Sequence, residues 1–169
     1  MKASRILLVM GLLSMLGLSC KTGGHGNDYV KRDAPTGKLT EFYYVHSGTM
    51  AQPFKEYSLK LLDNGEVEFF AHNLGEYHDT LIVTSEVLDT VSNMIIRNEI
   101  YRYKDHYTPS VEILDGEGWH YSAHYDDDVS LYSGGTNAWP RNYALPIISN
   151  YLDSIAVKAG ARNLGFEDW

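Results

Sequence analysis

The sequence predicts an α+β domain in which an antiparallel sheet of six to seven strands has two helices packed on one face. Three observations lead to this expectation. Several short stretches are aromatic and β-branched or alternate apolar with polar residues, as strands do. Turn-forming residues separate neighbouring stretches. Two longer segments carry apolar residues at helical spacing, one after each group of strand-like stretches.

Four strands are expected in the first half of the domain, at about 39–45, 56–62, 67–71 and 78–83. Each contains aromatic or β-branched residues and is bounded by turn-forming residues. The second and third flank Asn64-Gly65, and this dipeptide between two strand-like stretches is a strong hairpin signal. These two strands are therefore expected to pair.

A helix is expected after the fourth strand, because the spacing of apolar residues changes there to the helical period. Thr84 or Ser85 is the expected N-cap, and the helix should end near 99–101. Its apolar residues define one buried face: Val87, Leu88, Val91, Met94, Ile95 and Ile96.

A second β region and a final helix complete the predicted domain. The strands of this meander are placed at 111–114, 119–125 and 129–132, with turns at 115–118 and 126–128. The final helix is expected from about 143 to 158. Pro146 fits its first turn, where a missing N–H costs least.

The first twenty residues have the order of a secretory signal peptide. Lys2 and Arg5 provide a positive start, an apolar run from Ile6 to Leu18 follows, and the only cysteine, Cys20, comes directly after Ser19. The apolar run is too short to span a bilayer comfortably, and no basic stop-transfer cluster follows it. We therefore expect export.

The end of this segment resembles the lipobox of small bacterial lipoproteins of the Bacteroidetes type. Gly17, Leu18, Ser19 and Cys20 occupy the four lipobox positions, although that family prefers leucine where this chain has Gly17. The resemblance implies a signal peptide over 1–19, lipidation of Cys20, and anchoring to an envelope membrane, with the outer membrane favoured. An ordinary signal peptide with a chance cysteine is the alternative.

The remaining organisation and charge follow from composition. Residues 20–38 are expected to form the lipidated cysteine and a flexible tether, and residues 39–169 a single domain. Removal of Lys2 and Arg5 would leave 12 basic against 22 acidic residues, a net charge of −10. Such an acidic surface repels phosphate backbones, so we expect no nucleic-acid partner. It also repels anionic headgroups, so we expect the protein to attach to the lipid bilayer through the lipid on Cys20 and not by charge.

No motif in the sequence indicates catalysis, a metal or a cofactor. His120 and His124 should point to the same face of one strand but lie about 13 Å apart, too far to share a metal ion. The three carboxylates at 126–128 are expected to be solvated turn residues. The sequence has no nucleophile motif of the G-x-S-x-G kind. We therefore expect no cofactor and do not favour an enzyme.

The segment 133–143 has the most unusual composition in the domain. Trp139, Arg141 and Tyr143, with Asn137 nearby, are the residue types that dominate binding hot spots. The alternative, which packing statistics favour, is that Trp139 folds inward and plugs the junction between sheet and helix while Asn137 or Asn142 caps the helix.

Three functions are consistent with these observations. The first is a membrane-tethered, non-catalytic binding module for an envelope protein or a glycan. The second is a periplasmic hydrolase inhibitor that uses the 133–143 segment. The third is an envelope hydrolase whose site is assembled from distant residues, which would require a concave pocket with histidine and carboxylate side chains within hydrogen-bond reach.

Overall fold

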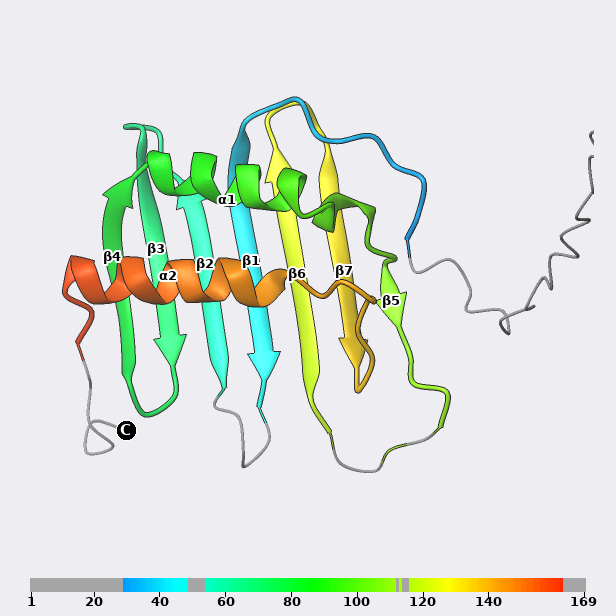
Figure 1. Ribbon diagram of the computed structural model, residues 1–169. Helices are drawn as coiled ribbons and strands as arrows, with labels where there is room; N and C mark the ends of the chain where they lie inside the picture. Colours follow the sequence, from blue (N-terminus) through cyan, green and yellow to red (C-terminus); the bar gives the residue numbers. More distant parts are fainter. Residues whose placement is uncertain (1–28, 49–53, 112, 114–115, 163–169) are drawn as a thin grey trace, which may run out of the picture.

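The computed structural model describes residues 29–48, 54–111, 113 and 116–162, and these residues form an α+β fold (Figure 1). Its sheet has seven strands in the order β4-β3-β2-β1-β6-β7-β5, and every neighbouring pair is antiparallel except β5–β7. The predicted fold class and antiparallel sheet are confirmed. The elements are β1 (Leu39–Ser47), β2 (Lys55–Leu61), β3 (Glu66–Asn73), β4 (Tyr77–Thr84), α1 (Glu86–Arg97), the 3₁₀ turn η1 (Ile100–Arg102), β5 (His106–Tyr107), β6 (Gly118–Tyr125), β7 (Ser130–Thr136) and α2 (Leu145–Ala159).

The first four strands form a meander, and β1 lies at the centre of the sheet between β2 and β6. The expected hairpin between β2 and β3 is present. Gly65 has a positive φ of 82°, and the amide of Leu62 donates to the carbonyl of Glu66 across the turn. Glycine adopts this left-handed conformation without the steric cost that a side chain would add.

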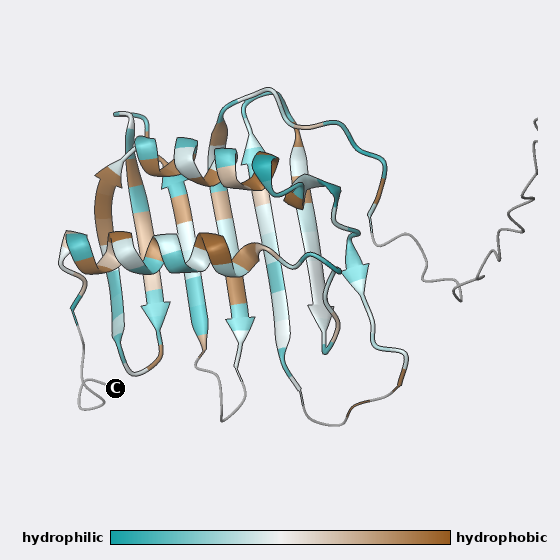
Figure 2. Ribbon diagram, in the orientation of Figure 1, coloured by the Kyte–Doolittle hydropathy of each residue, from teal (hydrophilic) through white to brown (hydrophobic). Residues whose placement is uncertain are grey.

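One face of the sheet is buried and the other is open to solvent. On β2, for example, Tyr57 and Leu59 are buried, whereas Ser58 between them is only partly buried. In Figure 1 both helices cross in front of the sheet, and in Figure 2 hydrophobic and hydrophilic residues follow one another along the strands and helices. The helices contribute these buried side chains to the core: Val87, Leu88, Val91 and Ile95 from α1, and Leu145, Ile148, Leu152 and Ala156 from α2.

The strand predicted at 111–114 is wrong. Val111 and Ile113 lie outside every strand and are 66% and 46% exposed, and positions 112, 114 and 115 are outside the described residues. The outer edge of β7 is paired instead by the two-residue strand β5, which runs parallel to it. The chain then connects β5 to the start of β6. Of the turn expected at 115–118, Gly116 and Glu117 are irregular and Gly118 already belongs to β6.

The helix and strand ends differ slightly from expectation. Ser85 is the N-cap of α1 but makes no side-chain capping bond. The final helix begins at Leu145 rather than near 143, with Pro146 in its first turn as expected. Strand β7 continues to Thr136 because its last residues pair with the first half of β6.

Residues 29–38, assigned to the tether from composition, lie against the domain. The amide of Val30 donates to the carbonyl of Arg102 at 2.8 Å. At the other end, the amide of Gly37 donates to Asp127 Oδ2 and that of Lys38 to Asp126 Oδ1, each at 2.8 Å. The acidic turn therefore binds backbone amides instead of being solvated only. Residues 20–28 of the expected tether lie outside the described residues.

Neither α1 nor α2 combines the length and apolar character that crossing a bilayer requires, and no other described helix does.

Candidate functional site

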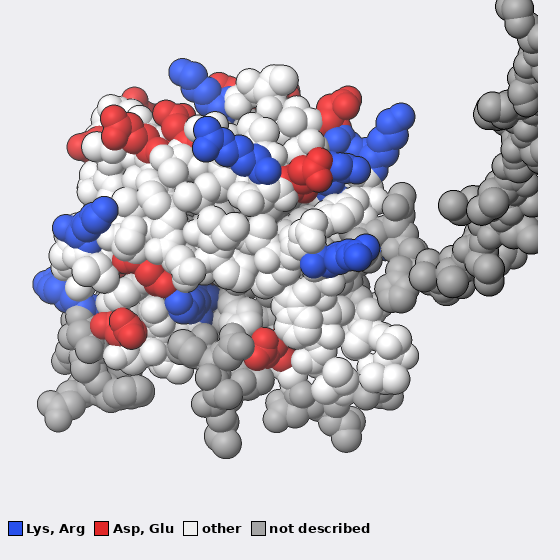
Figure 3. Space-filling view, viewed as in Figure 1, with Lys and Arg blue, Asp and Glu red and all other residues white. Residues whose placement is uncertain are grey.

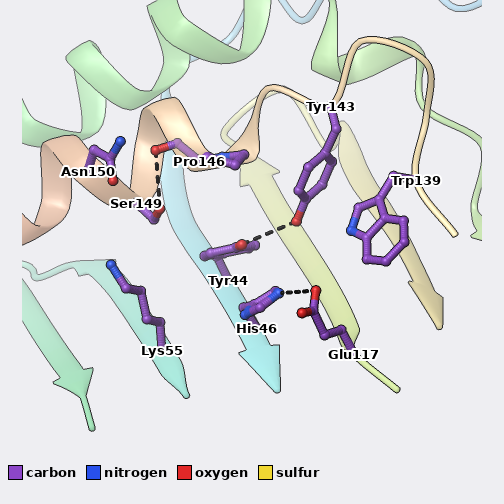
Figure 4. Close-up of a pocket in the computed structure, with 9 residues that line it drawn as sticks. All are labelled: Tyr44, His46, Lys55, Glu117, Trp139, Tyr143, Pro146, Ser149 and Asn150. Atoms are coloured by element: carbon purple, nitrogen blue, oxygen red, sulfur yellow. Dashed lines mark hydrogen bonds and ion pairs between the residues drawn. The ribbon is translucent and has the colours of Figure 1, made fainter. Parts of the chain in front are cut away.

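A cavity of about 410 Å³ lies beside the start of α2, near the ends of β1 and β2 (Figure 4). Its volume is in the range typical of small-molecule sites. Polar and aromatic side chains make up most of its wall: Tyr44, His46, Lys55, Glu117, Trp139, Tyr143, Pro146, Ser149 and Asn150.

The register of the sheet brings the floor of this cavity together. Tyr44 and His46 are two residues apart on β1, so their side chains share the buried face of the sheet. His46 lies directly opposite Lys55 on β2 and opposite Trp119 on β6. Glu117 immediately precedes β6 and therefore reaches the same corner. These residues come from distant parts of the chain, and only the strand pairing makes them neighbours.

The segment before α2 is held in place by hydrogen bonds with Glu117 and Trp119. Asn137 has a positive φ of 48°, its amide donates to the carbonyl of Glu117 at 2.8 Å, and its Oδ1 accepts from the amide of Glu117 at 2.9 Å. The indole N–H of Trp119 donates to the carbonyl of Ala138 at 2.8 Å. The backbone that carries Trp139 is thus fixed to β6 and its preceding residues.

The approach of the Ala138 carbonyl to β7 requires a glycine at position 135. A Cβ on Gly135 would stand 2.4 Å from the carbonyl oxygen of Ala138, which is well inside van der Waals contact. Only a residue without a side chain allows the segment to fold back over β7 at this distance. The Gly134-Gly135 pair in the sequence therefore serves the geometry of the site.

Trp139 is 39% exposed and lies at the edge of the cavity, beside Tyr143 (Figure 4). The expectation that Trp139 folds inward and plugs the junction is wrong. Trp119 is the buried tryptophan, at 3% exposure, and its ring packs against that of Tyr143 with 5.0 Å between centroids. Because Trp119 fills the junction, Trp139 is left at the surface.

The structure separates the four predicted contact residues by role. Trp139 and Tyr143 line the cavity, Asn137 fixes the backbone as described above, and Arg141 is exposed outside the lining. The alternative that an asparagine caps the final helix is also wrong. The N-cap of α2 is Ala144, which has no side-chain cap, and its amide donates to the hydroxyl of Tyr103 at 2.8 Å.

Two tyrosine hydroxyls meet on the cavity wall. The hydroxyl oxygens of Tyr44 and Tyr143 lie 3.2 Å apart. Burial raises the pKa of Tyr44 to about 12, and the nearby carboxylate of Glu117 acts in the same direction. Burial is also the main cause of the raised pKa of Tyr143, followed by its proximity to Tyr44. Both hydroxyls therefore remain protonated at neutral pH and can donate and accept hydrogen bonds.

The titratable groups at the cavity lie close to partners of opposite type. His46 Nε2 lies 3.4 Å from Glu117 Oε2, and Lys55 Nζ lies 2.7 Å from Asp153 Oδ2 on α2. More widely, Figure 3 shows lysine and arginine side chains scattered among acidic ones over this side of the molecule. The cavity therefore offers no strong field of a single sign to a ligand.

Asp153 is the centre of a hydrogen-bond network that includes Lys55 of the cavity wall. Its Oδ1 accepts from the hydroxyls of Tyr57, at 2.5 Å, and Tyr77, and from the side-chain amide of Asn73 at 3.3 Å. Burial alone would raise the pKa of this carboxyl group, but the bonds from Lys55 and the two tyrosines outweigh burial and lower it. The network fixes α2 to three neighbouring strands.

The histidines singled out from the sequence lie elsewhere. His120 and His124 are on the open face of β6. Partial burial lowers the pKa of His120. Nδ1 of His124 lies 2.9 Å from the hydroxyl of Ser130. Among the described residues, no three histidine, cysteine or acidic side chains are placed to hold a metal ion together. The histidine–carboxylate pair at the cavity, His46 with Glu117, could not be recognised from the sequence because the two residues are far apart in it.

Comparison with known proteins places the chain in no family: no protein-family model matches it, and neither does any curated protein. The fold and the cavity define the molecule as an α+β domain with a polar, aromatic-edged cavity at one end of its sheet. Any function therefore has to be inferred from that cavity.

Proposed function

We propose that this protein is a non-catalytic binding module of the bacterial cell envelope that takes its ligand at the Trp139 cavity. The observation that supports this proposal is a tryptophan, Trp139, that is 39% exposed at the cavity edge on a segment whose backbone is fixed by Trp119, Asn137 and Gly135. A rigid aromatic side chain on an ordered backbone loses less conformational entropy on ligand contact than a flexible one on a mobile loop. In this proposal both helices pack on the buried face, and the open face takes no part in the site.

The pair of His46 and Glu117 favours a second candidate, an envelope hydrolase with His46 as general base. The surrounding residues support binding better. The nearby hydroxyl of Ser149 donates to the carbonyl of Pro146 at 3.2 Å, and Lys55 is neutralised by Asp153. The described lining thus places neither an activated nucleophile nor an unpaired cation beside the pair. A hydrolase inhibitor, which would insert the Trp139 segment into its target, is a third use of the same surface.

A capture experiment with a matched control tests the binding proposal. Immobilised wild type, Trp139→Ala and Tyr132→Ala are each incubated with envelope extract of the source bacterium, and bound proteins and glycans are compared. Tyr132 is the control because it is an exposed aromatic residue, 52% exposed, on the open face. We expect specific capture by wild type and Tyr132→Ala, and its loss in Trp139→Ala, because hot-spot aromatics dominate binding energy. Equal capture by all three proteins, or loss only in Tyr132→Ala, would contradict the proposal.

We also propose that the module is held at the envelope by a lipid on Cys20, as its lipobox-like segment implies. The acidic surface cannot supply membrane attachment by charge, and several acyl chains on one cysteine anchor far better than one. Cells expressing the full chain and labelled with palmitate should incorporate label into wild type and lose it in Cys20→Ser. Labelling that persists in Cys20→Ser would show that the cysteine is not the site of acylation.

A further inference from the structure

We infer that the ligand of the Trp139 cavity is a neutral saccharide. This inference rests on the binding function proposed above and adds the chemical class of the ligand. Three properties of the cavity carry it: an exposed aromatic side chain at its edge, a wall rich in hydroxyl and amide groups, and the absence of an unpaired cation in its described lining.

The aromatic edge fits the apolar side of a sugar ring. A pyranose ring presents C–H groups on its faces and hydroxyls around its rim, so it packs against an indole or phenol ring while its rim stays polar. Trp139 and Tyr143 lie next to each other at this edge (Figure 4). Hydrogen bonds of Asn137 to Glu117 and of Ala138 to Trp119 fix the backbone before Trp139, and the hydroxyl of Tyr103 binds the backbone on either side of Tyr143. The backbone that carries the contact surface is therefore ordered before the ligand arrives.

The polar wall fits the rim of the ring. Tyr44 and Tyr143 place two protonated hydroxyls 3.2 Å apart on this wall. The exposed side-chain amide of Asn150 adds two donors and one acceptor. Sugar hydroxyls each donate and accept, so they match groups that do both. An apolar ligand would instead desolvate these groups without replacing their bonds to water, which costs free energy.

The pairing of charges distinguishes a neutral ligand from a charged one. A phosphate or carboxylate binds most strongly to unpaired donors of positive charge, but Lys55 is bound to Asp153 and His46 faces Glu117. A cation would have to compete with His46 for Glu117. A neutral polyhydroxylated molecule exchanges hydrogen bonds with these side chains and leaves the Lys55–Asp153 ion pair and the His46–Glu117 contact in place.

Titration calorimetry with a panel of short neutral oligosaccharides tests the inference. The panel contains oligomers of glucose, galactose, mannose and N-acetylglucosamine, and inorganic phosphate and glucuronate serve as charged probes. Wild type, Trp139→Ala, Trp139→Phe and Tyr132→Ala are compared. We expect at least one neutral oligosaccharide to bind wild type, with affinity reduced at least about tenfold in Trp139→Ala, largely kept in Trp139→Phe and unchanged in Tyr132→Ala.

The outcomes separate the ligand class from the site. If no neutral oligosaccharide binds, or if phosphate or glucuronate binds instead, the saccharide inference is overturned while the binding function stands on the capture experiment. If an oligosaccharide binds but loses affinity only in Tyr132→Ala, the open face is the site and both proposals fail. Circular dichroism of each variant checks that the change in affinity does not come from unfolding.

Discussion

Replacing Asp153 by asparagine is expected to lower the free energy of unfolding by about 2–4 kcal/mol, because the substitution removes the charged acceptor of a half-buried network. The carboxylate accepts hydrogen bonds from Lys55, Tyr57, Tyr77 and Asn73. In the variant, the ammonium group of Lys55 loses its partner in a region where its side chain is only 23% exposed. Urea denaturation at neutral pH measures the difference.

The stability lost in Asp153→Asn is expected to depend on pH. The pKa of Asp153 is lowered in the folded protein, so its carboxylate contributes stability above the unfolded-state pKa, near 4, and that contribution is lost as the pH falls through the lowered folded value. The difference in stability between wild type and Asp153→Asn should therefore be full at neutral pH and shrink below pH about 4.

Asp128→Asn is the control for the Asp153 substitution. Asp128 is exposed and has a positive φ of 62°, which asparagine tolerates, so this variant should unfold with nearly the wild-type midpoint. If Asp153→Asn is as stable as Asp128→Asn at neutral pH, the network does not hold α2 on the sheet.

Replacing Gly135 by alanine is expected to cost about 1–3 kcal/mol and to displace the Trp139 segment. The added Cβ would meet the carbonyl oxygen of Ala138 at 2.4 Å and the indole nitrogen of Trp119 at 2.9 Å, so the bond between these two groups must lengthen or break. Thr136→Ala, at an exposed position on the same strand, is the control.

Two measurements follow the effect of Gly135→Ala. Urea denaturation gives the loss of stability, and the indole N–H resonance of Trp119 reports the hydrogen bond to Ala138. We expect the resonance to move in Gly135→Ala and to stay in place in Thr136→Ala. An unchanged Trp119 resonance together with wild-type stability would show that the segment is not packed as tightly as the structure indicates.

Local patterns in the sequence were sufficient for most of the fold. Asn64-Gly65 predicted the β2–β3 hairpin, and the apolar spacing after Ser85 predicted α1. β5 was missed because a two-residue strand has no period to recognise. The position of residues 29–38 was missed because backbone amides, whose partners are invisible in a sequence, make the bonds to Asp126 and Asp127.

The site was predictable only in part. Trp139 and Tyr143 were singled out by residue type alone, and both line the cavity. Glu117 and His46 were missed because their proximity depends on the register between β1 and β6. The sequence also did not predict that Trp119, and not Trp139, fills the junction between sheet and helix. The two residues have the same chemistry and differ only in their position in the fold.

The most direct test of the central claim is a two-dimensional ¹H–¹⁵N spectrum of the protein with and without soluble envelope extract. The claim is that the Trp139 cavity is the binding site. We expect the indole N–H of Trp139 and the backbone amides of 137–139 and 141–143 to shift or broaden, with little change at His120 and Tyr132. Changes confined to the open face around His120 and Tyr132, with Trp139 unmoved, would contradict it.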